Sequence, residues 1–282
     1  MELADNGCVA VGGIPVTIAG MSVVPASTKL LAVSVVSHGH GLLVAQLLLS
    51  LARHCAGSVA RVILTLNVPE AEPVAQDAGW PFDLQIRRNA LPLGFGANHN
   101  LALHAAEEPF VCVLNPDVVF LEGSDPLAVL VAAAQKQGVG CAYPSQVDGH
   151  GVTQDCERQL PTLPALVGRR LLGRSDVHVD WVNAACLVFP LPVWREVRGF
   201  DEAYFMYCED VDICLRVRLL GLALAKAPVS VVHAGQRASH RNWRHLSWHI
   251  RSLLRLWCTP TFWQARQLLQ SNVTSGGRIT PP

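Results

Sequence analysis

The chain has 282 residues, of which 50% are hydrophobic and 16% are charged. This composition excludes a disordered chain and predicts one large domain, or a domain with a small appendage, around a sizeable core. The formal net charge is zero, but its distribution is uneven. Residues 233–282 hold seven arginines and no acid, so the residues before them carry fifteen bases against all 22 acids. Four of the seven tryptophans also lie in this C-terminal segment.

Apolar runs, the N-terminal sequence and the cysteines indicate the cellular compartment of the protein. No apolar run approaches the ~20 residues that cross a bilayer, and the N-terminus lacks the basic start of a secretory signal. We interpret residues 1–28 as a loosely ordered leader, in which Met21 is an alternative start. Nine scattered cysteines without a C-x-x-C pair argue against a zinc site or a disulfide framework. We expect reduced thiols in a cytoplasmic protein.

Apolar strands alternate with helical segments along the first half of the chain. The pattern predicts strands at residues 31–36, 60–66, 83–86, 110–114, 138–143 and 223–232, with a strand-like segment at 180–191. It predicts helices at residues 42–54, 96–106 and 125–137 and within 204–220, while 146–180 is irregular and is assigned to the acceptor side. This alternation is typical of an α/β fold, a mostly parallel sheet with helices on both faces. Ligands bind such sheets beyond the carboxyl ends of the strands, where Ser37, His38, Asn67, Asn115 and Asp117 lie.

The segment Gly94-Phe-Gly-Ala-Asn-His99 begins like a dinucleotide-binding fingerprint. His99 occupies the place of the third glycine, and the chain has no G-x-x-x-x-G-K-[ST] loop, so a nicotinamide, flavin or P-loop site is excluded. Gly94 and Gly96 indicate a close approach of the backbone to another group. A phosphate at a helix start and a plain turn explain them equally well.

Two polar positions follow apolar strands. In Asn115-Pro-Asp117 the carboxylate is suited to a divalent cation that also holds a diphosphate, although the segment by itself favours a Pro-Asp turn. His233 ends the strand at 223–232 and is either a satisfied polar residue or a metal ligand.

Three carboxylates lie in Glu209-Asp-Val-Asp212, directly after the aromatic segment at 204–208. Mutual repulsion and loss of solvent raise at least one carboxyl pKa towards the range of a general base. Acids at a helix start also complement the helix dipole, and this structural role is the alternative.

In combination these segments resemble the family 2 inverting glycosyltransferases of the GT-A fold, and within them the bacterial rhamnosyltransferase-like branch. The resemblance covers about residues 31–257. The matching positions are Val35–His38, Leu64–Asn67, Pro69–Glu70, Asn89, Gly94–Asn100, Leu114–Asp117, Gly199–Glu202, Phe205–Cys214, Arg216 and His233.

The resemblance implies roles for the matching residues. Asp210 would be the catalytic base and Glu209 would help hold the acceptor, while Asp117 and His233 would bind a divalent metal, Mg²⁺ or Mn²⁺. Donor binding would fall to Ser37, His38, Asn67, Asn89, Gly96, Asn98 and Asn115. The sequence departs from the family pattern at Asn115 and Leu66, where many relatives have Asp, and at His38 and His40, which replace a Tyr-Asn pair.

The resemblance implies transfer of a sugar, with L-rhamnosyl from dTDP-L-rhamnose as first choice, to a hydroxyl of a lipid-linked or cell-surface polysaccharide such as an O-antigen. A UDP-sugar donor and a non-catalytic glycan-binding relative are the alternatives. A nucleotidyltransferase is disfavoured because no Lys or Arg lies between Ser34 and Gln46. No nucleic-acid partner is expected.

The glycosyltransferase domain is predicted at residues 29–236, followed by a basic, Trp-rich helical tail at 237–282. In the predicted helix at 244–257 one apolar face is formed by Leu246, Ile250, Leu253, Leu254 and Trp257, with Arg244, Arg251 and Arg255 away from it. This pattern favours peripheral contact with an anionic membrane. The alternatives are a helix packed on the domain, or Arg237 and Arg241 reaching the diphosphate.

Overall fold

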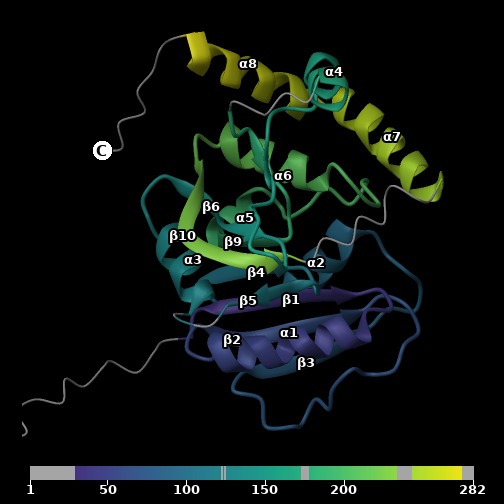
Figure 1. The fold of residues 1–282 in the computed structure, drawn as a ribbon, viewed down its shortest axis with the longest axis vertical. Coiled ribbons are helices and arrows are strands. Elements are labelled where there is room, and N and C mark those ends of the chain that lie inside the picture. The colour runs from purple at the N-terminus through teal and green to yellow at the C-terminus, as the bar shows by residue number, and fades with distance from the viewer. Residues whose placement is uncertain (1–28, 122, 124, 173–177, 234–242, 275–282) are drawn as a thin grey trace, which may run out of the picture.

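The computed structural model describes residues 29–121, 123, 125–172, 178–233 and 243–274. The predicted leader at 1–28, together with Arg237 and Arg241, lies outside the described residues. The centre of the fold is one eight-stranded sheet with the strand order β3-β2-β1-β4-β9-β6-β10-β5 (Figure 1).

The sheet is mostly parallel. Its strands are β1 (Leu31–Ser37), β2 (Val59–Leu66), β3 (Asp83–Arg88), β4 (Phe110–Leu114), β5 (Val118–Phe120), β6 (Val139–Val147), β9 (Cys186–Pro190) and β10 (Ala223–His233). β1, β2, β3 and β4 pair in parallel, as do β6 and β10. β9 runs antiparallel between β4 and β6, and β5 antiparallel beside β10. A small second sheet pairs β7 (Glu157–Arg158) with β8 (Trp181–Val182).

Helices cover both faces of the large sheet, as the alternation predicts. They are α1 (Gly41–His54), α2 (Phe95–Leu103), α3 (Pro126–Ala134), α4 (Leu163–Leu172), α5 (Leu191–Glu196), α6 (Glu209–Leu219), α7 (Trp243–Trp257) and α8 (Pro260–Thr274). α1 and α3 share one buried cluster with the sheet, and α2, α5 and α6 share another on the opposite face. Because both faces are covered, β1 and β4 are buried almost throughout and consist of near-continuous apolar residues.

Several elements differ from the sequence-based expectation. β6 extends four residues further than predicted, and the segment at 180–191 divides into β8 and β9 around a turn. The irregular segment at 146–180 contains β7 and α4, whereas α8 lies within the tail that was predicted to be helical. The two-residue strands β7 and β8 and the short helix α4 have too few residues to show a clear period in the sequence.

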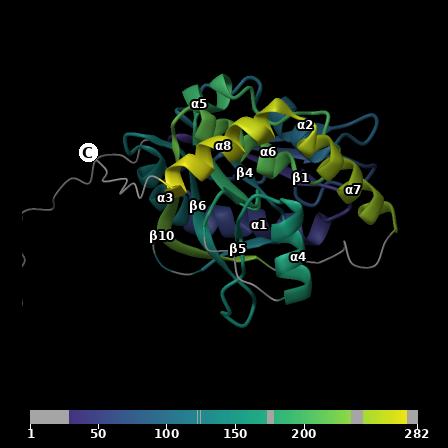
Figure 2. The ribbon, with the colours of Figure 1, turned by 90° about the horizontal axis from the view of Figure 1, so that it is seen from above.

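α7 and α8 pack on α6 and form a third buried cluster with it (Figure 2). In α7 the buried side chains are Ser252 and Leu256. The predicted apolar face is therefore divided: Leu253 and Trp257 contact this cluster, whereas Leu246, Ile250 and Leu254 are exposed. Packing against α8 and the segment that precedes α6 decides which side of α7 is buried. None of the described helices is long and apolar enough to cross a membrane.

Candidate active site

Amide side chains at the carboxyl edge of β2 form a connected network. Asn67 accepts hydrogen bonds from Asn89 Nδ2 and from the backbone N–H of Leu93, both at 2.8 Å. Asn89 Nδ2 also donates to Asn98 Oδ1 at 2.6 Å, and Asn98 donates to the carbonyl of Gly94 at 2.9 Å. The network joins β2, the loop after β3 and the start of α2. It brings together Asn67, Asn89 and Asn98, three of the seven residues that the sequence assigns to donor binding.

The loop after β1 is held by a carboxylate to which the sequence assigned no role. Ser37 Oγ donates to Glu70 Oε2 at 2.9 Å, and the backbone N–H of Gly39 donates to Glu70 Oε1 at 3.1 Å. The ring of His38 lies 3.1 Å from Asn67 Nδ2. Ser37 and His38 therefore border the amide network. In the sequence, Glu70 was noted only because Pro69-Glu70 matches the pattern of the family that the chain resembles.

The close approach indicated by the two glycines is to protein atoms. A Cβ at Gly94 would lie 2.7 Å from the carbonyl oxygen of Phe205, and one at Gly96 would lie 2.5 Å from Cβ of Phe200. His99, in the third glycine position, is fully buried beside Ser34, and burial lowers its pKa to about 3. These contacts pack α2 against the segment that leads to α6. A role of Gly96 near a phosphate stays a prediction.

Asn115-Pro-Asp117 forms the turn between β4 and β5. The backbone N–H of Val118 donates to the carbonyl of Asn115 at 3.3 Å, so the predicted turn is present. Asp117 Oδ2 lies 3.4 Å from His233 Nε2, because β10 pairs with β5 and places His233 opposite Val118. Burial favours the neutral carboxyl, but the hydrogen bond and charge of His233 outweigh it and hold the Asp117 pKa below its ordinary value.

The pair of Asp117 and His233 suits a divalent cation in its chemistry. A carboxylate and an imidazole are accepted ligands of Mn²⁺. His233 Nδ1 is buried and has no hydrogen-bond partner in the described part of the chain, so its side chain is incompletely satisfied. Among the described residues no third His, Cys, Asp or Glu joins the pair, so further ligands would come from a diphosphate or water.

The strongest electrostatic feature lies at the first turn of α6. Glu209 is buried, and burial together with the charge of Asp210 raises its pKa well above the ordinary value. Its Oε2 has no hydrogen-bond partner among the described residues. Burial also raises the pKa of Asp210, to about 6, although hydrogen bonds from backbone N–H groups and the charge of Arg158 oppose the rise. The third acid, Asp212, instead pairs with Arg216 at 2.7 Å.

The backbone that leads to these acids is strained. Tyr207 and Cys208 have φ values of 73° and 65°, in the left-handed region that side chains other than glycine rarely adopt. Each such residue costs on the order of 1–3 kcal/mol, and strain of this kind gathers at active sites. Two consecutive cases directly before Glu209 and Asp210 therefore make this turn a candidate functional site.

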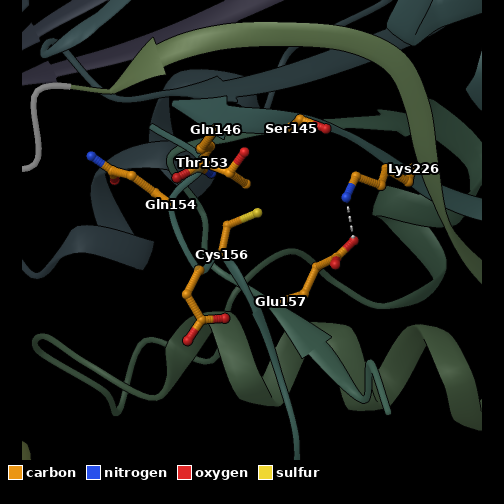
Figure 3. Close-up of a pocket in the computed structure, with 8 residues that line it drawn as sticks. Ser145, Gln146, Thr153, Gln154, Cys156, Glu157 and Lys226 are labelled. Carbon is orange, nitrogen blue, oxygen red and sulfur yellow. Dashed lines mark ion pairs between the residues drawn. The ribbon is translucent and has the colours of Figure 1, made fainter. Parts of the chain in front are cut away.

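The segment at 146–180 contributes to the same region. Arg158, which also pairs with Asp155, acts electrostatically on Asp210. The segment also lines a cavity of about 240 Å³, in which Lys226 Nζ forms an ion pair with Glu157 Oε1 at 3.2 Å (Figure 3). Gln154 in its wall donates to the carbonyl of His233 at 2.9 Å. The sequence did not predict a role for Arg158 or Gln154, because only the folded chain brings Arg158 near Asp210 and Gln154 near His233.

The predicted residues thus fall into three groups: the amide network, the pair of Asp117 and His233, and the acids of α6. The charge of His40, in the loop after Ser37, helps to lower the pKa of Asp117 and so links the first two groups. Within the described ranges no hydrogen bond or ion pair joins Asp210 to either of the others.

Known proteins give an independent comparison. No family model matches the chain. The chain is 29% identical over 187 residues to the rhamnosyltransferase WbbL of Escherichia coli, a match that covers 57% of this chain and 69% of that protein. It is 31% identical over 165 residues to the N-acetylglucosaminyl-diphospho-decaprenol L-rhamnosyltransferase of Mycobacterium tuberculosis. That match covers 51% of this chain and only 53% of the mycobacterial protein.

The structural comparison concerns the fold. The mannosyltransferase PcManGT of Pyrobaculum calidifontis, solved with GDP-Man and Mn²⁺, superposes with a TM-score of 0.57 at 16% identity. The match covers 88% of this chain and 76% of that one. The chain is a glycosyltransferase of the GT-A fold. In sequence this glycosyltransferase is similar to the rhamnosyltransferase branch of family 2, as its motifs predicted.

Proposed function

We propose that this glycosyltransferase works by a single displacement that inverts the anomeric carbon of a nucleotide sugar. The carboxylate turn of α6 carries the proposal. A carboxyl whose pKa is about 6 is ionised at neutral pH, yet it accepts a proton more readily than an ordinary aspartate. Asp210 is therefore suited to be the general base, and a protein that only binds glycans has no use for such a group.

In the proposed reaction Asp210 takes the proton of an acceptor hydroxyl. The hydroxyl oxygen forms a bond to the anomeric carbon on the face opposite the leaving group. The bond from that carbon to the diphosphate oxygen breaks, and its electron pair leaves with the nucleoside diphosphate. Glu209, one residue before the base, helps to hold the acceptor.

The donor is proposed to bind along the carboxyl edge of the sheet. Ser37, His38 and Asn67 line the nucleoside pocket, with Asn115 nearby. Asn89, Gly96 and Asn98 lie near the diphosphate and the sugar. The hydrogen-bonded amide network supports this assignment because it fixes these side chains before a ligand arrives.

Asp117 and His233 are proposed to hold Mg²⁺ or Mn²⁺. Such an ion supplies positive charge that stabilises a departing diphosphate. Support comes from the chemistry of the pair, from its unsatisfied imidazole nitrogen and from the Mn²⁺ bound by PcManGT.

We propose dTDP-L-rhamnose as the donor and a lipid-linked or cell-surface polysaccharide as the acceptor. The names of the two rhamnosyltransferases support this choice, and the mycobacterial name includes a lipid diphosphate acceptor. A lipid-linked acceptor requires work at a membrane surface. We therefore propose peripheral contact with anionic lipid on the cytoplasmic side, supported by the exposed Leu246, Ile250 and Leu254 and the arginine-rich tail.

A donor screen tests the proposal. Thermal shift and donor hydrolysis are measured with dTDP-rhamnose, UDP-glucose, UDP-galactose and GDP-mannose, each with and without Mn²⁺. We expect the largest response to dTDP-rhamnose with Mn²⁺. A larger response to a UDP-sugar would change the donor and keep the chemistry, whereas no response to any donor would favour a non-catalytic relative.

A further inference from the structure

A cavity of about 510 Å³ lies between α7 and the segment that precedes α6. Its volume falls within the range of small-molecule sites. Its lining residues are Ala203, Phe205, Trp248, Arg251, Ser252 and Arg255. Four of the six come from α7, so this cavity exists only because the C-terminal helix packs on the domain.

The cavity is lined by two aromatic rings, and hydrogen bonds hold α7 against the segment that precedes α6. The Phe205 and Trp248 rings have centroids 5.1 Å apart and are tilted by 49°. Ser252 Oγ donates to the carbonyl of Met206 at 2.8 Å and ties α7 to the strained segment. The Tyr207 hydroxyl lies 2.9 Å from His245 Nδ1 and gives a second attachment.

The charge of the cavity is positive. Arg255 pairs with Asp201 at 2.9 Å, so part of its charge is compensated. Arg251 is exposed and makes no ion pair within the described part of the chain. A guanidinium beside aromatic faces is suited to a phosphate or diphosphate that adjoins an apolar or sugar group.

The cavity borders both halves of the proposed active site through Phe205. The carbonyl of Phe205 accepts a hydrogen bond from the backbone N–H of Phe95 at 2.9 Å, at the start of α2. Four residues after Phe205 the chain reaches Glu209 and then Asp210. An acceptor anchored in the cavity would therefore contact Phe205, in the segment that leads into the turn with Asp210.

We infer that this cavity binds the phosphate-bearing part of the acceptor, with Arg251 as the principal anion contact and Phe205 and Trp248 as the platform for the adjoining group. The inference rests on the proposed transfer to a diphosphate-linked acceptor. It assigns α7 a direct part in substrate recognition, beyond its packing on α6.

Binding of farnesyl diphosphate tests the inference without requiring turnover. The full chain is titrated by calorimetry in EDTA, which weakens binding of the probe at the proposed metal pair, and farnesol serves as the uncharged comparison. We expect Arg251→Gln to weaken farnesyl diphosphate binding about tenfold or more, the typical loss for a charge-assisted hydrogen bond, and to leave farnesol unchanged. Arg53→Gln, an exposed arginine at the end of α1, is the matched control and should bind as wild type does.

Equal loss in both arginine variants, or no loss in Arg251→Gln, would overturn the inference. Vesicles with and without phosphatidylglycerol separate an acceptor site from a lipid contact. If Arg251→Gln changes only vesicle binding, Arg251 contacts lipid and the inference fails. Arg251-dependent binding without transfer from any donor would defeat the proposed function alone, whereas donor turnover with unaltered binding in Arg251→Gln would defeat only the inference.

Discussion

The amide network at the carboxyl edge of the sheet and the carboxylate turn of α6 differ in the charge of their polar side chains and in how far these side chains are hydrogen-bonded. In the network, the side chains of Asn67, Asn89 and Asn98 are neutral, and each makes hydrogen bonds. At the turn, Glu209 is buried and Asp210 is half-buried, both have raised pKa values, and one oxygen of Glu209 has no partner among the described residues. Neutral groups whose hydrogen bonds are all made rigidify a site. Burial of a carboxyl group raises the energy of its charged form and therefore its pKa. The first arrangement suits binding and the second suits proton transfer.

Removing the base should produce the largest difference between the two regions. We expect Asp210→Asn to lower kcat by roughly 10²–10⁴-fold, because general-base help is lost, and to leave the donor Kd near its wild-type value. Stopped assays of transfer and a donor titration measure the two quantities. Glu196→Gln, at an exposed position of α5, is the control. Turnover of Asp210→Asn within a few fold of wild type would remove the assignment.

The proposed metal pair should give the next largest effect. Asp117→Asn should raise the Mn²⁺ concentration needed for half-maximal activity and lower kcat about 10²-fold at fixed Mn²⁺, since charge stabilisation of this kind contributes several kcal/mol. A Mn²⁺ titration after EDTA treatment measures both. The exposed Asp77→Asn should behave as wild type. Activity that survives EDTA unchanged would contradict the assignment.

The pH dependence should distinguish the turn from the network, because Asp210 titrates with a pKa of about 6 whereas the amide side chains of the network do not titrate. The base must be ionised, so kcat/KM should fall as the pH drops through about 6, by about tenfold at pH 5. Arg158→Gln removes a charge that lowers the pKa of Asp210, so the acid limb should move to higher pH. A pH–rate profile of both proteins measures this shift. A flat profile between pH 5 and 8 would exclude Asp210 as the titrating group.

The smallest expected effect concerns the contact between the two regions. In Gly94→Ala the new Cβ would lie 2.7 Å from the Phe205 carbonyl oxygen, so α2 and the segment before α6 must move apart. Overpacking of this kind costs about 1–3 kcal/mol of unfolding free energy. Urea denaturation measures it, with Gly149→Ala as control, where an added Cβ meets open space. If the two variants have the same free energy of unfolding, the contact between Gly94 and Phe205 does not limit stability, and the prediction is wrong.

The elements that the sequence predicts well are those that are long or buried on both sides. The strands at β1, β2 and β4 were evident because burial on both faces requires continuous apolar runs. α4 and the division between β8 and β9 were missed, because their signals are short or depend on neighbours distant in the sequence. The buried side of α7 depends likewise on α8 and on the segment that precedes α6, and only part of the face that its periodicity predicted is buried.

The sequence by itself determined the class of fold, the order of strands and helices and the residue types that carry the proposed chemistry, since periodicity and local motifs depend on neighbours along the chain. It also showed the accumulation of arginine and tryptophan at the C-terminal end. Only the tertiary structure decided that Gly96 faces Phe200, that His233 meets Asp117 across paired strands and that α7 adds Arg251 to a cavity lined by Phe205. Each of these contacts joins residues distant in sequence, and burial, pairing and pKa shifts exist only once the chain has brought such residues together.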